Sequence, residues 1–209
     1  MVPLRIEQYV VGSVSTNCYF AINDETKEVL IIDPGASAVQ LAQKVKDGGL
    51  KPAAILLTHG HFDHASAAEE LAALLHVKIY AHEAERETLH TPGLNLSGWE
   101  GRADVYHVDE YVADEAELQL AGFVIRVLHT PGHTVGGCCY YFVEQSTLFS
   151  GDTLFCTSIG RTDFPKGSAS QLIRAITEKL MCLPDETSVY TGHGEMTTIG
   201  TERVYNPFL

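Results

Sequence analysis

The chain has 209 residues, of which 45% are hydrophobic and 20% charged, and this profile predicts a single globular domain over residues 1–209. Its formal net charge of −13 gives no broad positive field for a nucleic acid. No stretch approaches the ~20 apolar residues that span a membrane, and Arg5 and Glu7 interrupt any signal-peptide core. We therefore expect a cytoplasmic protein that binds neither nucleic acid nor membrane, with an oligomeric state that the sequence leaves unknown.

The first half of the sequence begins with strands and then alternates strands with helices. Runs of β-branched and aromatic residues before the turn Asp33-Pro34-Gly35 predict an antiparallel meander. Beyond this turn, Ser37 is the expected N-cap of a helix that reaches about Asp47 and stops at Gly48-Gly49. The elements predicted here are strands at 4–11, 17–23, 28–32, 53–57 and 77–81, and helices at 37–47 and 64–76.

The second half is again rich in strands, after an irregular segment at 83–104. Prolines and glycines such as Pro92 and Gly98 predict a loop with short helical pieces there, typical of a substrate-binding rim. Two β-rich halves with helices outside them predict an α/β (α+β) fold, a four-layer αββα sandwich. The remaining predicted elements are strands at 105–108, 117–120, 123–128, 138–143, 147–150 and 189–191, a helix at 168–180 and a short tail.

The five cysteines favour free thiols over a disulfide framework. Their number is odd, and none of them forms a Cys-x-x-Cys pair. Cys138 and Cys139 are adjacent in a predicted strand, so we expect their side chains to point to opposite faces of the sheet. This pattern agrees with a reducing compartment.

The sharpest chemical signal is the segment Thr58-His59-Gly60-His61-Phe62-Asp63-His64, between a buried strand and a helix. In extended backbone His59 and His61 point the same way, because side chains repeat every two residues. Asp63 and His64 then lie where the chain turns into the helix. Three imidazoles and a carboxylate this close together in an apolar setting are typical of a metal site.

Three further residues share one context, because each follows a predicted strand and has a glycine beside it. They are His133 after strand 123–128, Asp152 after strand 147–150 and His193 after strand 189–191. Strand ends at one edge of a sandwich converge on one place. The predicted metal ligands are therefore His59, His61, Asp63, His64, His133, Asp152 and His193.

With these residues in this order, the chain resembles the metallo-β-lactamase superfamily, and within it the short bacterial form of the glyoxalase II-like (hydroxyacylglutathione hydrolase-like) enzymes. The resemblance runs from Asp33-Pro34-Gly35 to His193. It implies the metallo-β-lactamase fold and two divalent metal ions, with zinc expected and iron or manganese as alternatives. It also implies one metal on His59, His61 and His133, the other on Asp63, His64 and His193, and Asp152 as a bridge.

The activity that this resemblance implies is hydrolysis of a small-molecule thioester by a metal-bridging hydroxide. Two metals roughly 3.5–4 Å apart can hold a hydroxide at neutral pH, because each lowers the pKa of bound water. Asp63 and Asp152 are the expected catalytic carboxylates, and Asp63 would orient the hydroxide. Many zinc β-lactamases have a cysteine where Asp152 stands, so the aspartate favours the hydrolase branch.

The identity of the substrate stays open. Only 16 residues follow His193, so the helical extension with which glyoxalase II enzymes bind glutathione is not expected. Arg161 is a candidate for binding a substrate carboxylate, with a structural pair to Asp163 as the equal alternative. Asp33 is in the same way either a plain turn residue or a support for a metal ligand.

Two other functions use the same residues. The chain also resembles the persulfide dioxygenases, mononuclear-iron oxygenases whose triad corresponds to His59, His133 and Asp152. Because the sequence keeps both ligand sets, it does not decide between oxygenase and hydrolase. A non-catalytic metal-binding module is disfavoured, since structural zinc sites are closed and usually four-coordinate.

Overall fold

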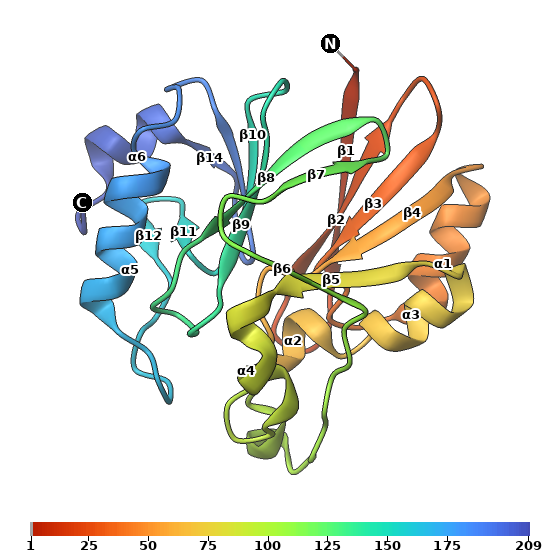
Figure 1. Ribbon diagram of the computed structural model, residues 1–209, viewed down its shortest axis with the longest axis horizontal. Helices are drawn as coiled ribbons and strands as arrows, with labels where there is room; N and C mark the ends of the chain where they lie inside the picture. The colour runs from red at the N-terminus through yellow and green to blue at the C-terminus, as the bar shows by residue number, and fades with distance from the viewer. Residues whose placement is uncertain (1) are drawn as a thin grey trace.

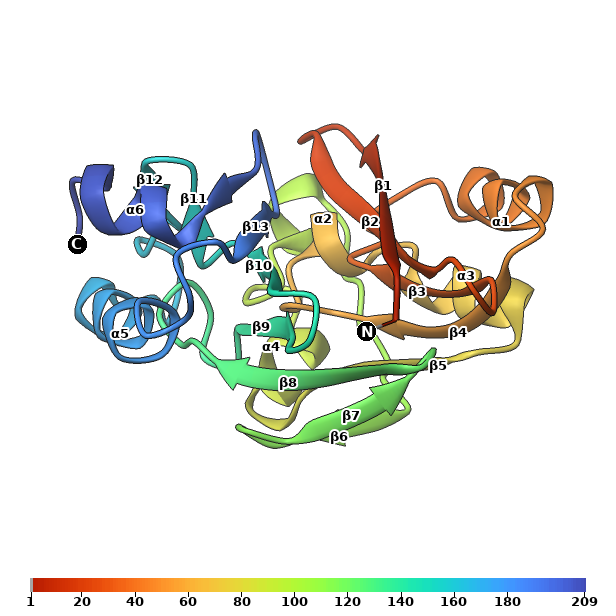
Figure 2. The ribbon, with the colours of Figure 1, turned by 90° about the horizontal axis from the view of Figure 1, so that it is seen from above.

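The computed structural model describes residues 2–209, whose strands form two six-stranded sheets and a small two-stranded one. The large sheets face each other and helices cover their outer faces, so the predicted αββα arrangement is confirmed (Figure 1 and Figure 2). The first sheet contains, in spatial order, β1 (Leu4–Val11), β2 (Thr16–Asn23), β3 (Glu28–Ile32), β4 (Lys51–Leu56), β5 (Lys78–His82) and β6 (Glu110–Val112). The second contains β14 (Thr197–Thr198), β13 (Ser188–Thr191), β10 (Thr147–Gly151), β9 (Cys138–Phe142), β8 (Phe123–His129) and β7 (Glu117–Leu120), while β11 (Leu154–Phe155) pairs with β12 (Ser158–Ile159).

Strand alternation divides the apolar side chains among three cores. On β2, Tyr19 and Ala21 belong to the core between the sheets, whereas Phe20 and Ile22 pack beneath the helices of the first sheet. Cys138 lies in the core between the sheets and Cys139 in the core beneath the helices of the second sheet, as the sequence predicted. All five cysteines are free.

The outer layers bury the apolar faces of amphipathic helices. On the first sheet, α1 (Ala38–Asp47) and α3 (Ala68–Leu75) contribute Leu41, Val45 and Leu71 to the core. On the second sheet, α5 (Ala169–Ala175) and the π-helical turn Ile176–Leu180 contribute Leu172, Ile176 and Leu180. The other helical segments are α2 (Phe62–Ala65), α4 (Arg86–His90), α6 (Ile199–Tyr205) and the 3₁₀ turns Glu83–Glu85 and Ser97–Glu100.

The helix predicted at 64–76 is divided in the structure, whereas the one predicted at 168–180 is continuous, because α5 leads directly into the π-helical turn. The break falls between α2 and α3, where the backbone N–H of Ala67 donates to Pro34 instead of continuing the helical ladder. The break lets α2 direct His64 into the site while α3 follows the sheet. Ser37 occupies the predicted N-cap position of α1, but it has a left-handed φ of 67° and its side chain accepts no cap hydrogen bond.

Two further local predictions are corrected. Residues 105–108 form no strand; the backbone N–H of Tyr106 donates to Leu89, its ring packs into a core, and the edge strand is β6 instead. The apolar spacing there reflects packing rather than a strand ladder. The expected tail after 191 instead contains β14 and α6, and β11 and β12 were not predicted. Within residues 2–209, no helix is both long and apolar enough to cross a bilayer.

The carboxyl ends of parallel strands place the ligand-bearing loops. β3, β4 and β5 run parallel in the first sheet, as do β10 and β13 in the second. Two hydrogen bonds also tie the segment after β4 to the second sheet. The Tyr140 hydroxyl donates to the Leu57 carbonyl at 2.9 Å, and the Cys138 N–H donates to the Thr58 carbonyl at 2.9 Å. The two sheets therefore meet where the histidine-rich segment begins.

Replacing Phe149 by alanine tests how far the sandwich depends on the core between the sheets. The ring is fully buried and lies 5.4 Å from Tyr19 and 5.3 Å from Phe142 between ring centroids. We expect Phe149→Ala to lower the free energy of unfolding by about 3–5 kcal/mol, because it removes apolar contacts and leaves a cavity. Urea unfolding at fixed metal content measures this. Val204→Ala, at a 69% exposed position, is the control and should change stability by less than about 0.5 kcal/mol.

Candidate metal centre

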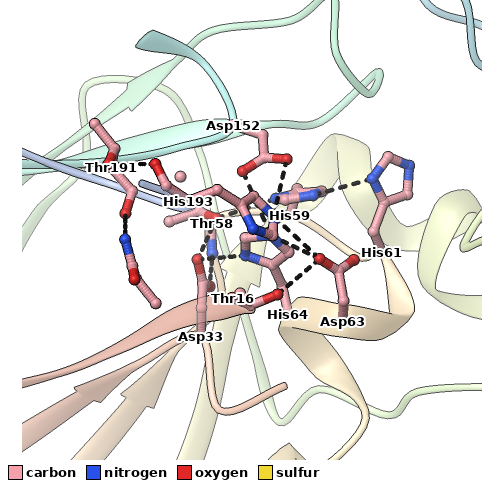
Figure 3. Close-up of polar contacts among 12 residues, drawn as sticks. Thr16, Asp33, Thr58, His59, His61, Asp63, His64, Asp152, Thr191 and His193 are labelled. Atoms are coloured by element: carbon pink, nitrogen blue, oxygen red, sulfur yellow. Dashed lines mark hydrogen bonds and ion pairs between the residues drawn. The ribbon is translucent and has the colours of Figure 1, made fainter. Parts of the chain in front are cut away.

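Seven side chains that can bind metals lie together where strands of both sheets end. Figure 3 shows those of His59, His61, Asp63, His64, Asp152 and His193. The segment after β4 supplies His59 and His61, and α2 supplies Asp63 and His64. The other three come from the loop between β8 and β9 (His133), from the residue after β10 (Asp152) and from the loop after β13 (His193). The structure therefore brings together every residue that the sequence predicted for the metal site.

The first group consists of His59, His61 and His133, all buried, with their ligand atoms within 4.8 Å of one another. His59 Nε2 lies 3.1 Å from His61 Nδ1, which lies 2.9 Å from His133 Nε2. Atoms bound at about 2.0–2.1 Å to one tetrahedral metal are about 3.4 Å apart, so these separations are close to those of a ligand set.

The second group consists of Asp63, His64 and His193. Asp63 Oδ2 lies 3.4 Å from His64 Nε2 and 3.2 Å from His193 Nε2, and the two Nε2 atoms are 3.4 Å apart. These separations match the same geometric expectation. His193 is the most exposed member, since 29% of its side chain is accessible.

Asp152 lies between the two groups. Its Oδ2 is 3.4 Å from His133 Nε2 of the first group, and its Oδ1 is 3.4 Å from His64 Nε2 of the second. Oδ1 is buried and accepts no hydrogen bond within residues 2–209. A buried carboxylate oxygen without a donor is costly, and a bound cation would satisfy it. The donor set therefore fits divalent metal ions.

At two positions next to the ligands, any residue larger than glycine would clash with its neighbours. A Cβ at Gly192 would lie 2.2 Å from Asp152 Oδ1 and 2.9 Å from His64 Cε1. Gly151 has a left-handed φ of 48°, and a Cβ there would lie 2.2 Å from Thr58 Oγ1. The glycines that accompany the predicted ligands in the sequence thus leave room for the ligands themselves.

Three of the histidines are held in the neutral form that binds metal. Burial, reinforced by His64 and His61, holds the pKa of His59 well below its usual range. Burial and His133 do the same for the pKa of His61. The pKa of His133 is also lowered, chiefly by burial, although Asp152 opposes the shift. The first group therefore presents lone pairs rather than protons.

His64 behaves in the opposite way, because carboxylates surround it. Burial lowers its pKa, but Asp63, Asp152 and Asp33 together raise it to about 10. Burial raises the pKa of Asp63, but the charge of His64 and a hydrogen bond from His193 lower it on balance. Positive charge is thus strongly favoured here, and a metal ion and a proton on His64 would compete for the same carboxylates.

Contacts outside the ligand set orient the rings. His64 Nδ1 lies 2.9 Å from Asp33 Oδ2, and His133 Nδ1 lies 2.8 Å from the Arg161 carbonyl. When these Nδ1 atoms donate, each Nε2 faces the site with its lone pair. Asp33 also accepts from the N–H and the hydroxyl of Thr58 at 2.7 and 2.6 Å. Of the two roles that the sequence left open for Asp33, the structure shows the supporting one.

Glu85 is a buried residue of the site region that sequence reasoning missed. It is fully buried, and its carboxylate accepts from the Gly60 N–H at 2.8 Å, the Gly136 N–H at 2.7 Å and the Thr134 hydroxyl at 3.0 Å. Burial raises its pKa, and these hydrogen bonds oppose the shift. One side chain thereby ties the segment of His59 and His61 to the segment of His133. Nothing local distinguishes Glu85 from the exposed Glu83 in the sequence.

A cleft of about 490 Å³ opens beside the metal centre. His61, Asp63, His133, Asp152 and His193 form its polar wall. The rest of the lining is mostly apolar, with Val14, Leu96, Trp99, Phe155, Ile159 and Phe164 among its members.

Arg161 lines the cleft but already has a partner. Its Nε and Nη2 donate to the two oxygens of Asp163, each at 2.7 Å. Its guanidinium carbon lies 4.1 Å from the centre of the Phe164 ring. Of the two roles that the sequence left open for Arg161, the structure shows the pair with Asp163.

Comparison with known proteins agrees with this geometry. A family profile described as metallo-beta-lactamase superfamily matches residues 11–193. The probable metallo-hydrolase YqgX of Bacillus subtilis is 40% identical, with 95% of this chain and 94% of the relative covered. Hydroxyacylglutathione hydrolase GloC of Haemophilus influenzae is 38% identical, with 99% and 98% covered.

Solved structures show the same fold. The crystal structure titled BLEG-1 B3 metallo-beta-lactamase matches with a TM-score of 0.93 and 41% identity, covering 98% of this chain and 99% of that one. TTHA1623 in a di-iron-bound form matches with a TM-score of 0.84 and 35% identity, covering 97% and 100%. Fold, ligand cluster and relatives agree that the chain belongs to the metallo-β-lactamase superfamily and is a metallo-hydrolase of that superfamily.

Proposed function

We propose that the protein is a thioester hydrolase that uses two divalent metal ions held by the seven side chains of the metal centre. The observation that carries the proposal is the position of Asp152, whose oxygens lie 3.4 Å from ligand nitrogens of both groups. A carboxylate in this position can bridge two metals, whereas one metal would not require both groups. The likeness to a relative named hydroxyacylglutathione hydrolase and to a structure titled di-iron-bound supports the same interpretation.

In this proposal His59, His61 and His133 would hold one ion, Asp63, His64 and His193 would hold the other, and Asp152 would be shared between them. Zinc is the expected metal, with iron and manganese as alternatives. Such a pair would supply a water activated at neutral pH and stabilise negative charge on the carbonyl oxygen of the substrate.

Asp63 has a second role in the proposal. Its Oδ2 accepts from the Thr16 hydroxyl at 2.8 Å and lies 3.2 Å from His193 Nε2, so the second oxygen can accept a hydrogen bond from the attacking water. Asp63 would therefore orient the attacking water through this oxygen. Hydrolysis adds the water oxygen to the acyl carbon, breaks the C–S bond and releases an acid and a thiol.

The proposal is tested by turnover measurements on protein of known metal content. Thioesters, a chromogenic cephalosporin, and glutathione persulfide with an oxygen electrode are assayed in parallel. We expect about two metals per chain and thioester hydrolysis with kcat/KM on the order of 10⁴ M⁻¹s⁻¹ or more. A single iron with oxygen uptake would establish the mononuclear oxygenase instead, and preferential cleavage of the cephalosporin would establish a β-lactamase.

Substitution of His193 separates the two metal positions. His193 is partly exposed in a loop, so His193→Ala should retain the fold while it removes one ligand of the second group. We expect the metal content to fall from about two ions to about one per chain. We also expect kcat to fall by more than about a hundredfold, which is the largest loss usual when a residue that only orients a metal ligand is replaced. Elemental analysis and the thioester assay measure both effects. His107→Ala, at an exposed histidine away from the cleft, is the control, and a His193 variant that retains two metals would contradict the assignment.

Glu85→Gln tests whether the buried carboxylate positions the two ligand segments. The amide cannot accept from all three donors, and its NH₂ group would oppose at least one of them. We expect metal affinity, measured by competition with a chelator of known strength, to weaken by about 10–100-fold while far-UV circular dichroism stays native. Glu83→Gln is the matched control, two residues away and exposed. Unchanged metal affinity in Glu85→Gln would show that this carboxylate does not position the ligands.

A further inference from the structure

We propose that the cleft beside the metal centre selects thioesters with an apolar group next to the scissile carbonyl, and that Trp99 and Phe164 are its specificity-determining residues. This inference rests on the proposed thioester hydrolysis and adds the substrate class. The observations that carry it are the apolar walls of the cleft, an aromatic pair at its rim, and the pairing with Asp163 of Arg161, the one arginine or lysine that residues 2–209 contribute to the lining.

The aromatic pair links the rim to the metal ligands. The ring centroids of Trp99 and Phe164 lie 5.4 Å apart at an interplanar angle of 68°. The Phe164 ring in turn lies 5.3 Å from the ring of His61 and 5.8 Å from that of His133. A substrate group that touches the pair therefore lies beside the place where a carbonyl would meet the metals.

Exposure marks the rim as a surface that a ligand can cover. Trp99 is 66% exposed and Val14, from the turn between β1 and β2, is 48% exposed, although both line the cleft. Large aromatic side chains gain much from burial, and an apolar ligand between these residues would remove their surfaces from water. At about 490 Å³, the cleft falls within the usual size range of small-molecule sites.

The arginines in and near the cleft disfavour a thiol carrier that has several carboxylates. Arg161 is the only arginine or lysine in the lining among residues 2–209, and Asp163 already accepts hydrogen bonds from its Nε–Nη2 edge. Nearby Arg102 contacts Glu100 and Asp104 at 3.4 and 3.3 Å. Glutathione carries two carboxylates, and Arg161 and Arg102 would have to share their charge between these carboxylates and the acidic side chains that they already contact. The Arg161 guanidinium packs over the Phe164 ring, with its central carbon 4.1 Å from the ring centre.

The first arm of the test varies only the acyl chain. Acetyl, butyryl, hexanoyl and octanoyl thioesters of the neutral thiol N-acetylcysteamine are assayed with the metal-loaded enzyme. We expect kcat/KM to rise about two- to fourfold per methylene until the cleft is filled. In Trp99→Ala the loss of kcat/KM should grow with chain length and reach at least about tenfold for the octanoyl thioester. Trp99→Phe should restore most of the lost kcat/KM. Tyr205→Ala changes a side chain that is 70% exposed on α6, and it should match the wild type.

A second arm replaces the carrier by glutathione with the acyl group fixed. Values of kcat/KM within about threefold of those with N-acetylcysteamine support the inference, and a gain of more than about tenfold overturns it, because the cleft would then recognise carboxylates. A flat dependence on acyl length also overturns it. If no thioester is cleaved at all, the proposed function fails instead.

A binding measurement needs no turnover. Trp99 is the single tryptophan of the chain, so its fluorescence reports on the cleft alone. Titration with octanoate should change the emission in a saturable way, whereas acetate and reduced glutathione at the same concentrations should not. Equal responses to octanoate and acetate would show that only the carboxylate is bound, and would overturn the inference.

Discussion

Concentrated negative charge at the meeting point of the two sheets is the constraint on which the rest of the structure depends. Asp33, Asp63 and Asp152 surround His64 and raise its pKa to about 10, while one oxygen of Asp152 is buried without a donor. Carboxylates withdrawn from water in this way require positive charge beside them. Divalent cations meet that demand, and the neutral imidazoles of the first group supply the remaining lone pairs.

The sandwich makes this concentration of charge possible because residues that are not metal ligands hold the ligand-bearing segments in place by hydrogen bonds. Hydrogen bonds from the second sheet anchor the carbonyl groups of Leu57 and Thr58. Asp33 forms hydrogen bonds with Thr58 and His64, and Glu85 links the segments that follow β4 and β8. These supports are buried, and Asp33 and Glu85 accept hydrogen bonds from backbone N–H groups as well as from side chains. The cleft outside them combines a wall of metal-binding side chains with a mostly apolar lining, in which Arg161, the one arginine or lysine among residues 2–209, is paired with Asp163.

Much of this arrangement could be predicted from local pattern. The positions of β2, β3 and β7 and the spacing of His59, His61, Asp63 and His64 are properties of short segments, and the strand-end context of Asp152 and His193 follows from the fold class. Glu85 could not be predicted, because its function depends on donors far away in the chain. The division between α2 and α3 likewise depends on a tertiary bond to Pro34. That residues 1–209 form one domain stays a prediction.

A crystal structure of the purified protein, with anomalous diffraction recorded at the absorption edges of zinc, iron and manganese, tests the central claim most directly. We expect two anomalous peaks roughly 3.5–4 Å apart. One should lie at about 2.0–2.2 Å from nitrogens of His59, His61 and His133, the other at a similar distance from Asp63, His64 and His193, and Asp152 should contact both. A single peak, or peaks elsewhere with Asp152 in contact with neither, would contradict it.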